Sequence, residues 1–342
     1  MADKERIAWL DVAKGTSILL VVTLHATHYL REYDLASYGF VQINNLFAPI
    51  RMPLFFAVSG LLGTRAVTRR WSELLTSRLV IFAYLFALWT FIRWAYFGNV
   101  QTNVLTPEEG STYAELLVAW VRPNTGIWFI WALAIFFFLG KLLYRVRHLA
   151  LPVFAVLAFL TFGHVIEIDA FSQRNLVWYA PFFLGGAWYG HHILRAVTER
   201  PLAVGILGGA VFAALSIAVA SLEGLAFGAG RLVLSVAGLA VGAAVSIALA
   251  AFLPSRTALT YLGRNTLPIY VAHVMIVAAL AAVLAVTTEN VPLVRYWGVP
   301  FIVAVTVVLA LGLKAAVDAA GLRWAYAPPV LPRRAAVAVG TA

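Results

Sequence analysis

The stretch "DVAKGTSILLVVTLHA", residues 11–26, decides the fold class of this chain. Together with its flanks it forms a mainly apolar segment over residues 8–29, and a bilayer core about 30 Å thick needs roughly 20 such residues to span it. Asp11 and Lys14 nevertheless interrupt the start of the segment, and His25 lies near its end. Ionisable groups at this depth are costly and face a bundle interior or a water-filled cavity. The stretch therefore predicts a membrane helix that also lines a polar site.

The composition of the whole chain is that of a membrane protein. Of its 342 residues, 62% are hydrophobic and 12% are charged, whereas soluble chains average about half apolar and a quarter charged. The chain has no cysteine, so it offers no disulfide framework and no thiolate metal site. No histidine–carboxylate cluster predicts a metal site either. The net charge of +10 comes from basic residues scattered between apolar segments, a pattern that does not predict nucleic-acid binding.

The same length criterion gives ten candidate transmembrane helices. They run near residues 8–29, 45–64, 79–98, 124–143, 149–166, 175–193, 202–221, 232–253, 267–287 and 297–317. The first is expected to be a retained span and not a cleaved signal peptide, because charged residues interrupt it. We therefore predict an all-α integral membrane protein with one membrane domain over residues 1–323 and a flexible cytoplasmic tail over residues 324–342.

Charge asymmetry predicts the orientation of these helices. Most of the 25 lysine and arginine residues fall on the side of the predicted bundle that contains the N-terminus, and cytoplasmic loops carry the excess of basic residues in membrane proteins. Because the number of predicted spans is even, both termini are expected to be cytoplasmic.

Lys14 and His25 form the first candidate site. They are eleven residues apart, which is three helical turns plus about 20°, so they share one face of the helix about 16 Å apart along its axis. Asp11 can reach Lys14 at i,i+3 spacing. A histidine, with an ordinary pKa near 6.5, can accept and return a proton in such a place. The alternative is that Lys14 extends to the interface and that His25 is a hydrogen-bonded packing residue.

Further polar residues fall within the second and ninth predicted spans. Arg51 lies near the outer end of the second span, and Ser59 precedes a glycine in its middle. Tyr270 and His273 are three residues apart in the ninth span, so they share a helix face. These residues indicate a polar cavity between the spans, although a serine–glycine pair also serves simple helix packing.

Five segments, taken together and in order, resemble the membrane-bound acyltransferase-3 family. They are "RIAWLDVAKGTSILLVVTLHA" (6–26), "IRMPLFFAVSGLL" (50–62), "IWFIWALAIFF" (127–137), "YAPFFLGGAWYG" (179–190) and "LGRNTLPIYVAH" (262–273). The first carries the family's signature of a basic residue, ten others and a histidine, here Lys14 and His25. The chain is most similar to the branch of fucose 4-O-acetylase-like and cell-envelope glycan acyltransferases.

The resemblance implies transfer of an acyl group from cytoplasmic acyl-CoA to a hydroxyl of a cell-envelope glycan or glycolipid, in the bacterial plasma membrane. Acetyl is the first expectation, and succinyl would need an additional cation, which Arg51 could supply. The chain departs from the branch at Arg51, where a histidine is usual. It also has "TRAVTRRW" (64–71) where the family has an Arg-x-x-Arg motif. No permanently bound cofactor is implied, and the oligomeric state stays open.

The resemblance also implies roles for individual residues. His25 is expected to be the general base, with Lys14 and Asp11 at the cytoplasmic mouth of the same helix. Candidate donors to the oxyanion are Arg51, Ser59, Tyr270 and His273. The candidates for binding the phosphates of acyl-CoA are Lys14, Arg65, Arg69, Arg70 and Arg78.

A multi-helix transporter or exporter of an envelope glycan precursor is the alternative function. Ten helices with buried polar residues suit such a protein. The sequence, however, shows no paired halves, and almost all carboxylates lie in predicted loops. A membrane scaffold without chemistry is the third interpretation, and it gives no reason for Lys14 and His25 to share a helix face.

Overall fold

The computed structural model describes residues 7–288 and 291–329, and within these ranges it contains helices and no strands. The prediction of an all-α protein is confirmed. The long helices are α1 (Ala8–Glu32), α2 (Tyr38–Thr68), α4 (Val80–Asn99), α6 (Trp128–Leu142), α7 (Arg147–Phe162), α8 (Phe171–Glu199), α9 (Pro201–Ala218), α10 (Gly224–Ala251), α12 (Thr266–Thr287) and α13 (Val294–Ala319). Helix α3 (Trp71–Leu74) runs into α4 through a π-helical turn at Leu75–Leu79.

Each of the ten predicted spans coincides with one of these helices. Eight helical segments of the described chain are long and apolar enough to cross a membrane. The other two are α6, which has only 15 residues, and α8, which is long but carries asparagine, proline and paired histidines. Both lie against other helices of the bundle. Asn175 of α8 is buried there, whereas His191 and His192, toward the other end of the helix, are exposed.

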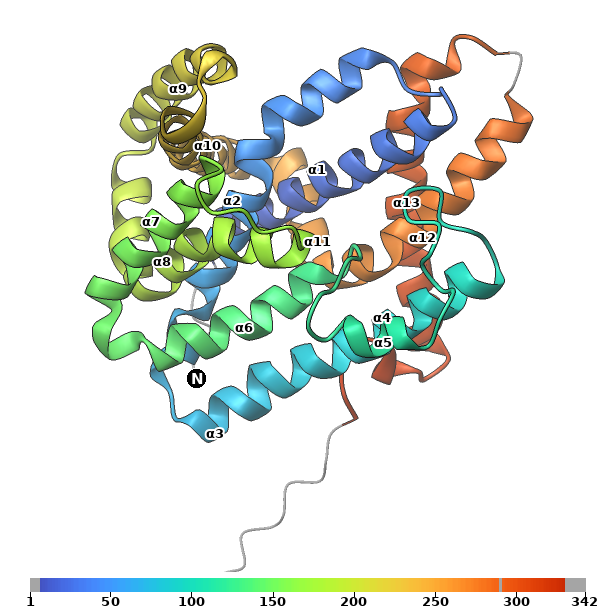
Figure 1. Cartoon of the computed structure of the whole chain (residues 1–342), viewed down its shortest axis with the longest axis horizontal. Helices are drawn as coiled ribbons and strands as arrows, with labels where there is room; N and C mark the ends of the chain where they lie inside the picture. The colour runs from blue at the N-terminus through green and yellow to red at the C-terminus, as the bar shows by residue number, and fades with distance from the viewer. Residues whose placement is uncertain (1–6, 289–290, 330–342) are drawn as a thin grey trace, which may run out of the picture.

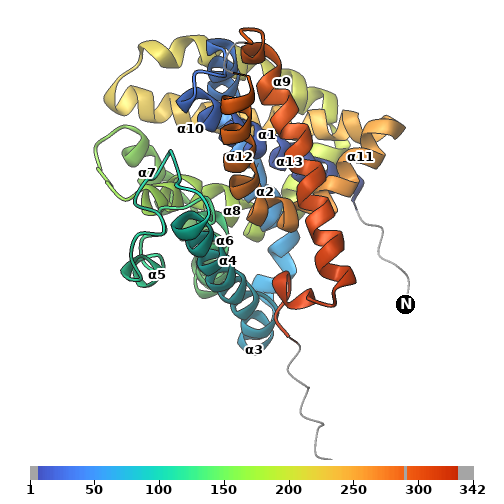
Figure 2. The same cartoon turned by 90° about the vertical axis from the view of Figure 1, so that its right-hand side faces the viewer.

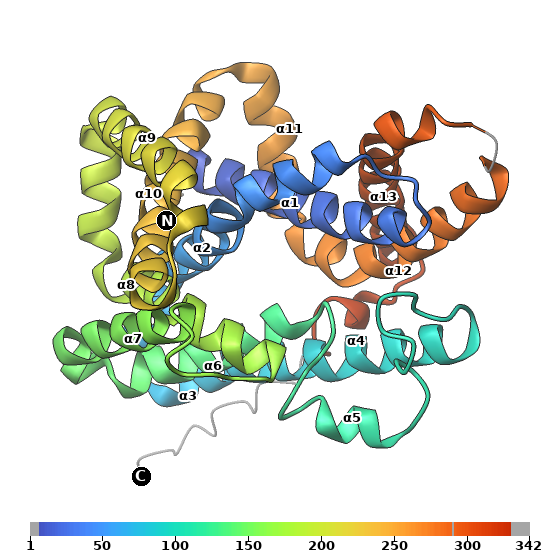
Figure 3. The ribbon, with the colours of Figure 1, turned by 45° about the horizontal axis from the view of Figure 1, so that its top comes forward.

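Helices α1 and α2 lie at the centre of the molecule, as Figure 1 shows, with α7 to α10 on one side and α12 and α13 on the other. Helix α1 contacts α2, α10, α12 and α13. Helices α4 and α6 pack against each other along one edge of the bundle, the lower edge in Figure 3. The first predicted span is therefore the helix around which the rest of the fold assembles.

Glycines let α2 and α8 approach each other closely. A Cβ atom at Gly60 would lie 2.1 Å from the carbonyl oxygen of Phe183, and one at Gly186 would lie 2.4 Å from that of Ala57. Small residues at such a contact allow two backbones to touch in a membrane bundle. The serine–glycine pair of the second span therefore does serve helix packing.

Helix α11 (Leu253–Arg264) is not among the predicted spans. It carries several polar residues and packs against the first half of α1. A Cβ at Gly15 would lie 2.2 Å from the carbonyl oxygen of Leu259, and one at Gly263 would collide with that of Asp11. The start of the quoted stretch is therefore covered by a helix whose short, polar sequence gives no membrane signal.

The segment after α13 folds back onto α4. Trp89 Nε1 donates to the carbonyl oxygen of Ala325 at 2.8 Å, the Tyr84 hydroxyl donates to that of Trp324 at 2.9 Å, and the Tyr326 ring stacks on Trp89. Figure 2 shows this return at the foot of α13. The first residues of the predicted tail thus pack on the bundle, and residues 330–342 of that tail lie outside the described residues.

Candidate active site

Two cavities, each of about 340 Å³, lie on opposite sides of a shared wall. The first, which we call the histidine chamber, is lined by His25, His28, Arg51 and Arg93 among others. The second, the basic chamber, is lined by Lys14, Ser59, Arg78, Arg264 and Tyr326 among others. Lys14 and His25, which share one face of α1, thus line two adjoining chambers.

Three aromatic side chains from three helices line both chambers: Phe55 of α2, Phe129 of α6 and Tyr270 of α12. The Phe55 and Phe129 rings are stacked, with centroids 4.5 Å apart and planes 11° apart, and the Tyr270 ring meets Phe129 edge-on. The Tyr270 hydroxyl accepts a hydrogen bond from the Phe129 backbone N–H at 3.1 Å and donates one to the Gly126 carbonyl. Two hydrogen bonds therefore fix the tyrosine in the wall.

His273 lies directly behind His25. The two ring centroids are 4.9 Å apart, and His273 is fully buried and does not line the chamber. Its Nδ1 lies 2.6 Å from the Tyr270 carbonyl oxygen. Because a carbonyl only accepts, Nδ1 is the nitrogen that carries the proton. Nε2 has no hydrogen-bond partner among the described residues. The backbone of α12 thereby fixes the tautomer and the orientation of this ring.

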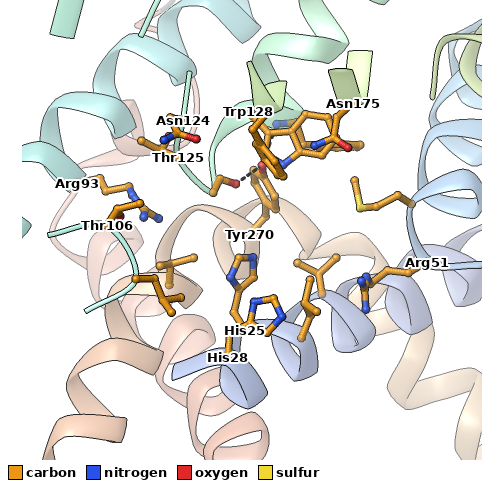
Figure 4. Close-up of a pocket in the computed structure, with 18 of the residues that line it drawn as sticks. His25, His28, Arg51, Arg93, Thr106, Asn124, Thr125, Trp128, Asn175 and Tyr270 are labelled. Carbon is orange, nitrogen blue, oxygen red and sulfur yellow. Dashed lines mark hydrogen bonds between the residues drawn. The ribbon is translucent and has the colours of Figure 1, made fainter. Parts of the chain in front are cut away.

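Arg93 and Arg51 lie on opposite sides of His25 in Figure 4. Arg93 holds Glu109 through two parallel bonds, one from Nε to Oε1 and one from Nη2 to Oε2 at 2.9 Å. Both side chains are buried, with exposed fractions of 6% and 7%. A guanidinium and a carboxylate that meet in this bidentate way form a strong and oriented contact.

The loop after α4 closes one side of the histidine chamber through this ion pair. Asn103 donates to Glu109 Oε2 at 2.6 Å and to the Thr106 hydroxyl at 2.7 Å, and its Oδ1 accepts from the Tyr29 hydroxyl at 2.6 Å. Tyr29 belongs to α1, one turn beyond His25. The network therefore ties the loop to the helix that carries the histidine.

Arg51 is held from the other side of the chamber. Its Nη1 donates to Asn44 Oδ1 at 3.3 Å, and Asn44 Nδ2 donates to the Thr27 hydroxyl at 2.8 Å. Thr27 is again a residue of α1. A polar ladder from α1 to α2 therefore orients the guanidinium.

The basic chamber holds three cationic side chains, Lys14, Arg78 and Arg264. Arg264 pairs with Asp11 at 3.5 Å, and Arg78 lies over the Phe137 ring at 5.6 Å. Ser59 lies in this chamber, and its hydroxyl donates to the Phe55 carbonyl at 2.8 Å. The chamber combines an apolar lining with positive charge. This combination suits an elongated ligand that has an apolar part and phosphate groups at one end.

The structure divides the predicted site residues into groups. His25, Arg51 and Tyr270 line the histidine chamber, with His273 behind them; Lys14, Ser59, Arg78 and Tyr270 line the basic chamber. Asp11 lies beside that chamber in its pair with Arg264. The remaining predicted phosphate-binding residues, Arg65, Arg69 and Arg70, are exposed and line neither chamber.

Sequence reasoning missed Arg93, Glu109 and Arg264 as site residues. Arg93 carried a usable signal, because it is an ionisable residue inside the predicted span 79–98, and such residues mark functional sites. Glu109 carried none, because it sits in a polar loop where carboxylates are ordinary. Arg264 lies at the predicted start of a span, where a basic residue is expected for orientation alone.

Comparison with known proteins adds two matches to this geometry. The profile of a family described as acyltransferase domain (acyltransferase 3) matches residues 7–315. The chain is also 26% identical over 236 residues to inner membrane protein YcfT of Escherichia coli (strain K12), a match that covers 63% of this chain and 65% of that relative, just under two thirds of its length. No solved structure matches the chain.

Proposed function

We propose that this chain, which belongs to the acyltransferase 3 family, transfers an acyl group from acyl-CoA to a hydroxyl of a cell-envelope glycan or glycolipid. The single observation that carries the proposal is the pair of chambers, one basic and one containing His25, on the two sides of one wall. The likeness to an inner membrane protein supports a place in the bacterial plasma membrane.

The donor enters through the basic chamber in this proposal. Lys14, Arg78 and Arg264 bind the phosphates of the nucleotide end, because ammonium and guanidinium groups are the usual protein ligands of phosphate. Lys14 and His25 lie about 16 Å apart along α1, so the extended arm of the donor runs along this helix. Its thioester then reaches the wall formed by Phe55, Phe129 and Tyr270.

The acceptor hydroxyl binds in the histidine chamber. His25 takes the hydroxyl proton as the oxygen attacks the thioester carbonyl, and a C–O bond forms. The tetrahedral oxyanion then collapses, the C–S bond breaks, and His25 returns the proton to the departing thiolate. Atoms and charge balance, because the proton lost by the acceptor is the proton gained by CoA.

Tyr270 is the group that we assign to the oxyanion. Its hydroxyl lies in the wall between donor and acceptor, and the Phe129 N–H and the Gly126 carbonyl already fix it there. Its single proton is donated to the Gly126 carbonyl, so this proton turns from that carbonyl to the oxyanion as negative charge develops there. Ser59 fits this task less well, because it lines the basic chamber and not the histidine chamber.

The proposal is tested by mass spectrometry of envelope glycans and glycolipids from a deletion strain complemented with wild type or with His25→Ala. Wild type should restore one acyl group per modified sugar, and His25→Ala, expressed at the same level in membranes, should not. Full restoration by His25→Ala would overturn the assignment of the base.

The same strains separate the proposal from the transporter alternative. Sealed vesicles that contain the protein should transfer label from acyl-CoA to an acceptor and should take up no glycan precursor. Uptake of precursor without any transfer of label would favour the transporter. The two assays use one membrane preparation, so differences in expression cannot explain opposite results.

A further inference from the structure

Arg51 is a buried cation in the histidine chamber. Its exposed fraction is 6%, and within residues 7–288 and 291–329 it forms no ion pair with a carboxylate. Burial of a guanidinium without an anionic partner costs free energy. Arg51 nevertheless lies buried in this chamber, where it faces His25 across the cavity (Figure 4).

One edge of the Arg51 guanidinium donates a hydrogen bond, and the other has no partner in the part of the chain that the structure describes. Nη1 donates to Asn44, which the hydroxyl of Thr27 supports in turn. Nε is buried and has no partner among the described residues. The Nε–Nη2 edge therefore remains as a two-pronged donor, the geometry that receives the two oxygens of one carboxylate.

In Arg93, which lines the same chamber, the Nε–Nη2 edge binds a carboxylate. Its Nε and Nη2 hold the two oxygens of Glu109. Within residues 7–288 and 291–329, no acid occupies the corresponding edge of Arg51. The titratable groups that interact with it electrostatically include Tyr179, Arg231 and the two histidines of α1, His25 and His28, and none of these is a carboxylate. The two arginines of the chamber thus differ in one respect, namely that the protein itself supplies the anion for only one of them.

We propose that the anion for Arg51 comes from the substrate, and that the group bound there is a carboxylate. This inference rests on the proposed acyl transfer for its biological meaning. The carboxylate belongs either to the free end of a dicarboxylic acyl group on the donor or to an acidic sugar of the acceptor. In either case Arg51 is a specificity residue: it selects a charged substrate and holds it beside His25.

Two matched pairs of probes test the proposal and identify the source. Succinyl-CoA and butyryl-CoA carry acyl groups of four carbons and differ in the terminal carboxylate. Methyl glucuronide and methyl glucoside differ in the same way among sugars. Two measurements are made on the full-length protein: transfer of labelled acyl groups in membranes, with the sugars as competitors, and the thermal midpoint of the purified protein with each probe.

Wild type should favour the carboxylate member of one pair by about tenfold or more, because a charge-assisted hydrogen bond contributes roughly 1.5–3 kcal/mol. Arg51→Gln should abolish this preference. Arg51→Lys should keep part of it, because the charge remains while the two-pronged edge is lost. Arg31→Gln, which removes an exposed arginine at the end of the neighbouring helix α1, should leave the preference unchanged.

Preference for succinyl-CoA assigns the carboxylate to the donor, and preference for the glucuronide assigns it to the acceptor. Equal responses of wild type to both members of both pairs would overturn the proposal, and this comparison requires no variant to fold. A preference that survives in folded Arg51→Gln would overturn it as well. The shift of the thermal midpoint requires no turnover. If the carboxylate probe of one pair raised the midpoint more than its neutral counterpart, but no acyl group were transferred, the carboxylate site would be supported and the proposed function refuted.

Discussion

His25 and His273 come from helices α1 and α12, and their rings meet with centroids 4.9 Å apart, yet only His25 lines the chamber. His273 is fully buried and is bound through Nδ1 to the Tyr270 carbonyl. In the proposed mechanism it therefore acts through His25 as a positioning residue. A fixed neighbour of this kind sets the orientation in which the base meets its substrate.

Replacement of His273 should accordingly lower turnover and leave donor binding intact. We expect His273→Leu to reduce kcat about a hundredfold, the cost of a small displacement of a catalytic group, with an unchanged KM for acyl-CoA. His273→Asn retains a side-chain N–H near the position of Nδ1 and should recover part of kcat. Steady-state kinetics in membranes measure both parameters, and a rise in KM with constant kcat would contradict the positioning role.

The Phe55–Phe129 stack predicts a second effect, on the fate of the acyl group. Phe129→Ala should join the two chambers and admit water to the thioester, so hydrolysis of acyl-CoA without acceptor should increase at the expense of transfer. Release of free CoA in the absence of acceptor measures this hydrolysis.

The matched control for the wall is Phe162→Ala. Phe162 is buried and stacks on Trp178 at 4.8 Å, but it lines neither chamber. Both variants should lose about 3–5 kcal/mol of stability, the usual cost of truncating a buried phenylalanine. Only Phe129→Ala should increase hydrolysis. Equal hydrolysis in the two variants would show that the wall does not protect the thioester from water.

The buried pair between Arg93 and Glu109 predicts a third effect, on stability. Glu109→Gln leaves the guanidinium of Arg93 buried without its carboxylate, and breaking a buried pair in this way costs about 3–5 kcal/mol. The thermal midpoint of the purified protein should fall clearly. Glu108→Gln changes the preceding, exposed residue and should leave the midpoint unchanged. Equal midpoints for the two variants would show that the pair does not hold the loop.

The basic chamber predicts which arginines bind the donor. Arg78→Gln should raise the KM for acetyl-CoA about tenfold, because it removes a charge-assisted bond within the chamber. The double variant Arg69→Ala, Arg70→Ala should raise it less, about twofold, because these two arginines do not line the chamber and act on the bound donor only through solvent. The opposite order of KM values would indicate that the loop at residues 64–71, and not the basic chamber, binds the phosphates of the donor.

The sequence predicted the parts of this account that depend on local patterns. Span length located the ten long helices. Helical spacing placed Lys14 and His25 on one face of α1 and Tyr270 and His273 on one face of α12. In the structure these two helices meet, so that His25 faces the chamber in front of His273.

The remaining parts depend on contacts between distant segments. Glu109 meets Arg93 only because the loop after α4 folds back over the chamber. The open edge of Arg51 becomes visible only once every nearby carboxylate has been placed. The division into two chambers follows from rings of α2, α6 and α12 that meet in space, and no spacing along the chain encodes that meeting.

In the proposed mechanism, His25 receives the acceptor's proton at the wall between the chambers. The most direct test is transfer of a labelled acyl group from acyl-CoA by purified wild type and His25→Ala in lipid vesicles, with bound acyl-CoA measured in parallel. We expect His25→Ala to bind acyl-CoA as wild type does and to transfer at least about a hundredfold less label. Transfer at the wild-type rate by a folded, donor-binding His25→Ala would contradict this mechanism.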